Sequence, residues 1–213
     1  MTEGYAYLHG FASSPRSKKA ALLARVFEDR GVHLHVPDLN RPSFATLTLS
    51  AQLDAVDALV QAHPEVTTWR FVGSSMGGWL AARWAELHPE RVDRLVLLCP
   101  GFAMVERWPK LVGAEGMARW RAHGGLPFPD ADGRPTAVHW GFIEDALTQP
   151  QSPPVPCPTV IIHGTSDATV PIETSRAYVA AHPLATLVEV DDGHLLANAA
   201  ATIEARVRSC FGL

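Results

Sequence analysis

Short apolar runs alternate with longer amphipathic stretches along most of the chain, and this alternation constrains the fold more than any other feature. Several of the short runs lack polar alternation, which is typical of parallel strands covered on both faces. We expect strands at 5–8, 32–36, 70–72, 95–98, 159–162 and 186–190, and helices at 17–30, 44–62, 76–88, 172–181 and 195–210. This order of elements predicts an α/β fold with a mostly parallel sheet of about six strands, flanked by helices on right-handed crossovers.

The length of 213 residues favours a single domain, because domains commonly hold roughly 100–200 residues. A formal net charge of −4 without a basic stripe argues against nucleic acid as a partner. The N-terminus lacks the pattern of a signal peptide, and no run approaches the ~20 apolar residues of a membrane span. Cys99, Cys157 and Cys210 are odd in number and widely spaced, which favours buried thiols in the cytoplasm over disulfides or a zinc site. We therefore expect no metal and no membrane insertion.

The stretch 100–158 interrupts the alternation and is rich in Gly, Pro and aromatic residues. Structureless segments of this length are uncommon in compact domains unless they form lids or binding elements. We interpret it as a cap inserted within the single domain 1–213. Its aromatic residues either bury one another or line a ligand pocket, and the candidates for substrate binding are Trp108, Trp120, Trp140 and Phe142.

The segment Gly73-Ser74-Ser75-Met76-Gly77 follows a predicted strand and begins a predicted helix. Gly-x-Ser-x-Gly in this context is the pattern of a nucleophile elbow, in which a strained turn exposes the serine at the helix N-terminus. The alternative is an ordinary Gly-Ser turn in which Ser75 caps the helix.

Two further polar residues follow predicted strands, where ligand chemistry gathers in open α/β sheets. Asp167 lies just beyond the strand at 159–162, and His194 lies just beyond the strand at 186–190. The chain order Ser75, Asp167, His194 is the order expected for a serine nucleophile, an acid and a base in this architecture. We expect His194 to accept the Ser75 proton and return it to the leaving group, with Asp167 orienting the imidazole. As single residues, Asp167 and His194 could equally serve as turn and cap residues.

The backbone N–H groups of Phe11 and Met76 are the candidates for an oxyanion hole, since Phe11 follows the first strand and Met76 follows the serine. We expect His9 to organise that loop by hydrogen bonding rather than to transfer protons. Other acids are weaker candidates than Asp167 for the residue that orients His194. Asp38 precedes Ser75 in the chain, Asp191 and Asp192 adjoin His194, and Asp145 lies in the cap stretch.

Together, these residues resemble those of the α/β-hydrolase superfamily. The segment 7–15, Tyr-Leu-His-Gly-Phe-Ala-Ser-Ser-Pro, more narrowly resembles that of the YqiA-like small bacterial esterases. The resemblance spans nearly the whole chain and implies cofactor-free hydrolysis of esters or thioesters. The stretch 100–158 is longer and more aromatic than a minimal member needs, so the resemblance does not carry over a substrate size.

The resulting hypothesis is a serine carboxylesterase that acts on a small-molecule ester through an acyl-enzyme. An acyl-CoA thioesterase is the first alternative, with Arg16, Lys18 and Lys19 meeting phosphates, although these residues also suit a solvated helix start. C–C bond hydrolysis and perhydrolysis remain open, because cap shape decides between such chemistries. A small-ligand-binding protein of hydrolase fold is the non-enzymatic alternative. The oligomeric state is open.

Overall fold

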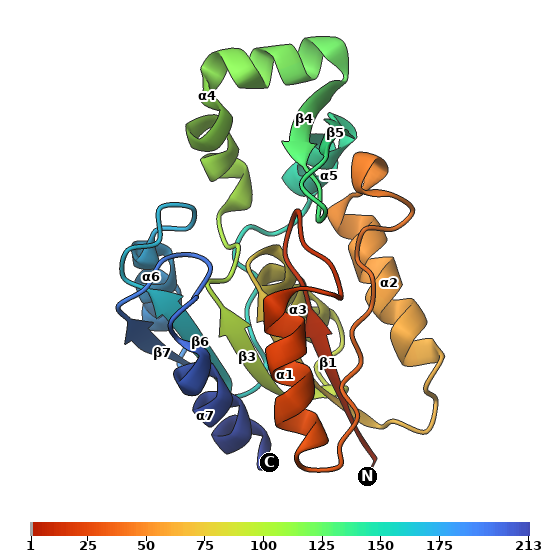
Figure 1. The fold of residues 1–213 in the computed structure, drawn as a ribbon, viewed down its shortest axis with the longest axis vertical. Helices are drawn as coiled ribbons and strands as arrows, with labels where there is room; N and C mark the ends of the chain where they lie inside the picture. Colours follow the sequence, from red (N-terminus) through yellow and green to blue (C-terminus); the bar gives the residue numbers. More distant parts are fainter. Residues whose placement is uncertain (1) are drawn as a thin grey trace.

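The computed structural model describes residues 2–213. Five parallel strands form the main sheet in the order β1-β2-β3-β6-β7 (Figure 1). The strands are β1 Glu3–Leu8, β2 Thr68–Ser74, β3 Val92–Leu98, β6 Thr159–Gly164 and β7 Ala185–Val190. The α/β architecture with a parallel sheet that the alternation predicts is therefore present, with one strand fewer in the main sheet than expected.

Helices cover both faces of the sheet, and each face has its own core (Figure 1). The helices of the first face are α2 Leu49–Gln61, α3 Met76–Leu87 and α6 Ile172–Ala181, and those of the second are α1 Lys18–Glu28 and α7 Ala200–Phe211. Neighbouring residues of one strand serve opposite cores, since Leu97 packs in the first and Leu98 in the second. This double coverage is why the strands read as continuous apolar runs.

The predicted strand 32–36 forms only a single bridge, between His35 and Ala6 of β1. The His35 N–H donates to the Tyr5 carbonyl, and the His35 carbonyl accepts from the Tyr7 N–H. The next ladder bond would need an N–H two residues later, where Pro37 has none. The missing donor ends the pairing, which explains why the predicted sixth strand is absent from the main sheet.

Two predicted helices begin later than expected. The stretch 44–62 divides into a short 3-10 helix, Phe44–Thr46, and α2, because Leu47 and Thr48 are extended and the Thr48 side chain caps α2 by accepting from the Ala51 N–H. The stretch 195–210 becomes helical only at Ala200, since Leu196 adopts a left-handed φ of 51°.

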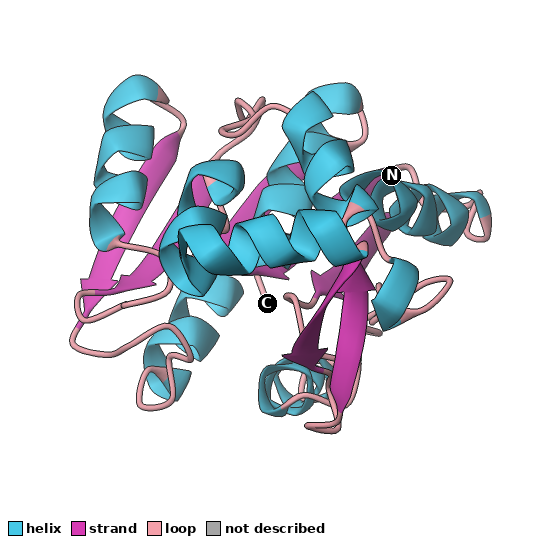
Figure 2. Cartoon of the chain, turned by 90° about the horizontal axis from the view of Figure 1, so that it is seen from above, coloured by secondary structure: helices cyan, strands magenta, loops and turns pink. Residues whose placement is uncertain are grey.

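The stretch 100–158 is ordered into α4 Met104–His123, β4 Gly125–Pro129, β5 Pro135–His139 and α5 Gly141–Thr148. Strands β4 and β5 form an antiparallel hairpin apart from the main sheet (Figure 2). Helix α4 rises from the end of the sheet and turns sharply, at Gly113, whose φ of 75° is not helical (Figure 1). Within residues 2–213, no helix is both long and apolar enough to cross a membrane.

Candidate active site

Ser75 occupies the turn between β2 and α3, with a φ of 54° and a ψ of −118°. Backbone hydrogen bonds hold this conformation: the Ser75 N–H donates to the Leu98 carbonyl at 2.8 Å, and the Ser75 carbonyl accepts from the Gly101 N–H at 2.7 Å. A Cβ at Gly77 would lie 2.1 Å from the Leu8 carbonyl oxygen, so only glycine allows α3 to pass this close to β1. Strained backbone of this kind persists where the surroundings over-determine it, as at functional sites.

Asp167, His194 and Ser75 form one chain of hydrogen bonds. His194 Nδ1 lies 2.7 Å from Asp167 Oδ2, and His194 Nε2 lies 3.0 Å from Ser75 Oγ. The carboxylate accepts only, so it fixes the proton on Nδ1 and leaves Nε2 free to accept the hydroxyl proton. The loops that carry the acid and the base are joined through the Ser166 N–H, which donates to the Asp192 carbonyl at 3.0 Å.

The Asp167 side chain is fully buried, yet both of its oxygens have partners. Oδ1 accepts from the Thr169 and Val170 N–H groups, each at 2.8 Å, and Oδ2 lies 3.2 Å from His163 Nε2 as well as beside His194. Burial by itself raises the pKa of Asp167, but the hydrogen bonds from His163, His194 and Val170 outweigh it and hold the pKa well below its ordinary range. Asp167 is therefore an anion at neutral pH.

His163 was not assigned a role from the sequence, although it stands at the end of β6, four residues before Asp167. Its Nδ1 lies 2.7 Å from Ser175 Oγ, and its Nε2 lies 2.8 Å from the Val170 carbonyl oxygen. These contacts anchor the loop that bears Asp167 to α6. The sequence did offer a signal for this role: His163 lies at the end of the same strand that the candidate acid Asp167 follows.

Cys99, His163 and Asp167 present donor atoms within 4.8 Å of one another, a spacing that a metal ion could bridge. The chemistry of the set disfavours it, because burial raises the pKa of the Cys99 thiol to about 12 and both His163 nitrogens are already engaged. A metal here would also have to compete with His194 for Asp167. Cys99 and His163 are better described as buried neighbours of the acid Asp167.

The loop after β1 lies against Ser75 and is organised by His9. The Leu39 N–H donates to His9 Nε2 at 3.1 Å, so Nδ1 carries the ring proton and donates to the Gly10 carbonyl oxygen at 3.0 Å. Burial lowers the pKa of His9, in keeping with a neutral ring. The backbone N–H of Phe11 donates to no group of residues 2–213, and Met76 is the first residue of α3, where helical N–H groups lack intrahelical acceptors.

Two cavities meet at Ser75 and His194. The first, here named the α4 cavity, has a volume of about 330 Å³ and lies between Ser75 and α4, with Phe128 of β4 in its wall. The second, the α1–α7 cavity, has a volume of about 530 Å³ and is lined by Lys19 of α1 and Ile203 of α7. Phe11 borders both cavities, so a bound ester can extend in two directions from the serine.

Of the four aromatic residues proposed for substrate binding, only Trp108 lines the α4 cavity. Trp120 and Phe142 are fully buried and stack on one another, and the Trp120 Nε1–H donates to the Val138 carbonyl at 2.8 Å. Trp140 packs edge-on against Trp120 and borders neither cavity. Three of the four proposed residues therefore pack within the segment itself and do not line either cavity.

The remaining candidates fall outside the chain of hydrogen bonds. Asp38 accepts from the Asn40 N–H, Asp145 accepts from the Ser50 N–H, and Asp192 accepts from the Gly193 and Asn198 N–H groups in the loop of His194. Of the basic residues at the start of α1, Arg16 and Lys18 are exposed, whereas Lys19 is half-buried in the α1–α7 cavity, and burial lowers its pKa.

Residues 4–208 match the family described as "Uncharacterised protein family (UPF0227)". A pimeloyl-(acyl-carrier protein) methyl ester esterase from Chromobacterium violaceum is 27% identical over 202 aligned positions, and the match covers 79% of each chain. Among solved structures, the alpha/beta hydrolase domain-containing protein 10 from mouse has a TM-score of 0.81 at 19% identity, covering 98% of this chain and 89% of its own. The ferulic acid-bound Est1E from Butyrivibrio proteoclasticus has a TM-score of 0.79 at 20% identity, covering 98% and 87%. These structural matches establish the α/β-hydrolase fold.

Proposed function

The chain belongs to the UPF0227 family, and on that premise we propose that it is a serine carboxylesterase that cleaves acyl esters through an acyl-enzyme on Ser75. The observation that carries this proposal is the continuous hydrogen-bond chain from Asp167 through His194 to Ser75, with links of 2.7 and 3.0 Å. The Chromobacterium violaceum relative is named a methyl ester esterase, which supports ester hydrolysis as the reaction class.

The mechanism follows from the proton positions. Ser75 Oγ attacks the acyl carbonyl carbon while His194 Nε2 takes the hydroxyl proton, and the resulting imidazolium is stabilised by ionised Asp167. The N–H groups of Phe11 and Met76 donate hydrogen bonds that stabilise the negative charge on the carbonyl oxygen. His194 then protonates the departing alcohol. In the second half, water gives a proton to His194 and attacks the acyl-enzyme, which releases the carboxylic acid and restores the Ser75 hydroxyl.

We further propose that the segment 100–158 acts as a cap over the serine within one domain. Met104, Trp108 and Leu111 of α4 line the same cavity as Ser75 and His194. Such a mostly apolar wall binds the hydrocarbon part of an ester.

The test is hydrolysis of p-nitrophenyl esters of increasing chain length by the native protein and by the Ser75→Ala variant. Removal of a serine nucleophile of this type lowers kcat by about 10⁶-fold, so the variant is expected to show no enzymatic turnover above background. The chain length with the highest kcat/KM measures the room that the two cavities leave. Equal hydrolysis by both proteins would contradict the proposal.

Thioester hydrolysis is the second candidate, and Lys19 is the observation that favours it, because its side chain lines a cavity that contains Ser75. The ratio of thioester to ester kcat/KM decides between the two substrates. A ratio above one that falls on charge reversal of Arg16, Lys18 and Lys19 together would favour an acyl-CoA substrate.

A further inference from the structure

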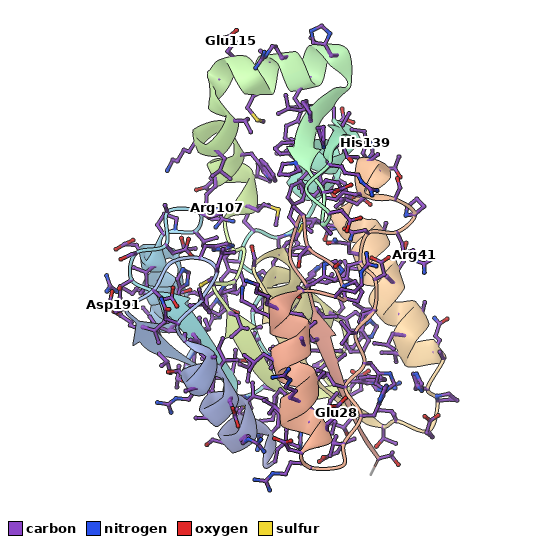
Figure 3. All side chains as sticks on the ribbon, viewed as in Figure 1. Glu28, Arg41, Arg107, Glu115, His139 and Asp191 are labelled. Carbon is purple, nitrogen blue, oxygen red and sulfur yellow. The ribbon has the colours of Figure 1, made fainter. Side chains whose placement is uncertain are left out.

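Arg107 is a half-buried cation without a partner beside the candidate active site. It lies in the first turn of α4, at the foot of this helix in Figure 3, and lines the α4 cavity together with Ser75 and His194. Its Nε and Nη1 atoms are closed off from solvent and donate no hydrogen bond to any group of residues 2–213. Unmet donors of a buried charged group destabilise a fold, so their presence here calls for a physical reason.

Arg107 differs from the other arginines that have a buried, unpaired nitrogen. Arg83 donates through Nη1 to Glu86 Oε2 at 2.6 Å, and Arg91 donates through Nη2 to the Val66 carbonyl at 3.0 Å. No hydrogen bond or ion pair joins Arg107 to another of the described residues. Its place in the first turn of α4 adds a further disadvantage, since the helix dipole disfavours a cation at the N-terminal end.

Arg107 has no carboxylate partner at hydrogen-bond distance: the charge of Asp167 acts to raise its pKa, but Asp167 forms neither a hydrogen bond nor an ion pair with it. The indole Nε1 of Trp108, the next residue and also part of the cavity wall, is a second buried donor without a partner. No Asp or Glu lines the α4 cavity, and its wall is otherwise mostly apolar. Burial lowers the pKa of Arg107 to about 10, which still leaves the guanidinium charged at neutral pH.

We propose that the α4 cavity binds a carboxylate carried by the substrate, and that Arg107 is the specificity-determining residue that pairs with it. This proposal rests on the proposed ester hydrolysis and names its substrate class: an ester that also bears a free carboxylate, such as a half-ester of a dicarboxylic acid. A guanidinium presents parallel N–H groups that match a carboxylate, and the Trp108 indole N–H supplies a further donor. The cavity volume of about 330 Å³ accommodates a short hydrocarbon chain between this carboxylate and Ser75.

Lys19 is the contrasting cation in the neighbouring α1–α7 cavity. Its Nζ is not among the buried polar atoms that lack a partner, so water still reaches it. The Lys19 ammonium is therefore solvated without a ligand, whereas two of the three Arg107 guanidinium nitrogens, Nε and Nη1, are closed off from water and unpaired. This difference assigns the carboxylate to the α4 cavity.

The test compares esters that differ only in charge. Monomethyl adipate is paired with the methyl ester of adipic acid monoamide, in which a neutral amide replaces the carboxylate. A second pair places the carboxylate or the amide on the alcohol side of an acetate ester. For each pair, the ratio of kcat/KM, carboxylate over amide, is measured for the native protein and for Arg107→Met, Arg107→Lys, Lys19→Met and Lys110→Met.

In one pair, the native protein is expected to favour the carboxylate at least tenfold, and Arg107→Met is expected to lower this ratio by about 10- to 100-fold. Arg107→Lys is expected to keep an intermediate ratio, because it retains the charge but not the paired N–H groups. Lys110 is exposed on the same helix, so Lys110→Met makes the same change in charge and leaves the ratio unaltered. Because a ratio cancels the amount of folded enzyme, partial misfolding of a variant does not obscure the result.

A ratio near one in the native protein, or a ratio that Arg107→Met leaves unchanged, would overturn the inference. A drop in Lys19→Met in place of Arg107→Met would overturn it as well. Ser75-dependent hydrolysis of the amide ester would meanwhile uphold the proposed function, so the two failures are distinguishable.

If no ester is hydrolysed, calorimetry with adipate on Ser75→Ala and on Ser75→Ala combined with Arg107→Met replaces the assay. Binding by the first and not by the second would uphold the carboxylate site without the esterase. Equal binding, or no binding, would overturn the inference.

Discussion

Asp167 and Arg107 are charged side chains near His194, the first fully and the second partly withdrawn from water, and they differ in what surrounds them. The carboxylate of Asp167 has partners at both oxygens, three of them closer than 3.0 Å. Arg107 has two buried nitrogens and no partner among residues 2–213. A charge whose hydrogen bonds are complete is a preorganised part of the fold, whereas a charge whose hydrogen bonds are missing suits a ligand that supplies them.

The largest effect, a loss of kcat, is expected from Asp167→Asn, which disrupts the complete set of hydrogen bonds around Asp167. The Thr169 and Val170 N–H groups hold the amide oxygen at the Oδ1 position, so the NH₂ group faces His194 Nδ1. Nδ1 then has to accept, and the ring proton moves to Nε2, which can no longer take the proton of Ser75. We expect kcat to fall by about 10⁴-fold, as measured by steady-state hydrolysis of a p-nitrophenyl ester.

The matched control is Asp145→Asn, the same chemical change at a partly buried carboxylate that pairs with Ser50 away from His194. Its kcat should stay within about threefold of the native value, because no hydrogen bond to His194 changes. An equal loss of activity in the two variants would mean that Asp167 has no special relation to the base.

A smaller effect is expected from Arg107→Met, which should stabilise the protein in the absence of ligand. Removing an unpaired buried charge should raise the free energy of unfolding by about 1–3 kcal/mol, measured by urea denaturation without ligand. Burial lowers the pKa of Arg107 to about 10, and a base with a lowered pKa in the folded state destabilises that state while it is protonated. This destabilisation begins to fall only as the pH rises through about 10, so the gain should be constant from about pH 6 to about pH 9. A loss of stability would reveal a partner for the guanidinium.

The smallest effect concerns His9, a buried base whose neutral form has partners for both nitrogens. Because burial lowers the pKa of His9, the unfolded chain takes up a proton below about pH 6.5 that the folded protein resists. Stability is therefore complete above this pH and declines as the pH falls, by up to about 1.4 kcal/mol per pH unit for one group. Replacing His9 with Gln removes this contribution, so urea denaturation between about pH 7.5 and pH 5 should give a flatter curve for His9→Gln. Parallel curves for the two proteins would mean that His9 does not set the slope.

The sequence predicted the parts of the molecule that depend on local pattern and chain order. The covered strands, the elbow at Ser75 and the order Ser75, Asp167, His194 leave signals of this kind, and the structure places these three side chains in contact. The strand at 32–36 was overpredicted because apolar character was weighed and the missing N–H of Pro37 was not.

The facing of the aromatic residues and the environment of the cations could not be predicted. Trp108 and Trp120 lie on α4 before and after the break at Gly113, and tertiary packing decides that one borders the α4 cavity and the other is enclosed. Arg107 reads as one more charged residue near the start of a helix until the cavity and the lack of a partner are known. Both properties arise from tertiary packing, which periodicity does not encode.

The most direct test of the central claim is reaction of the native protein with a serine-directed fluorophosphonate, followed by peptide mass spectrometry. Activation by His194 predicts a single stoichiometric adduct on the peptide that contains Ser75, formed far more slowly in Asp167→Asn, because the base then holds the wrong proton. A native protein that remains unlabelled, or one that is labelled at a serine other than Ser75, would contradict the account and favour a ligand-binding role for the site.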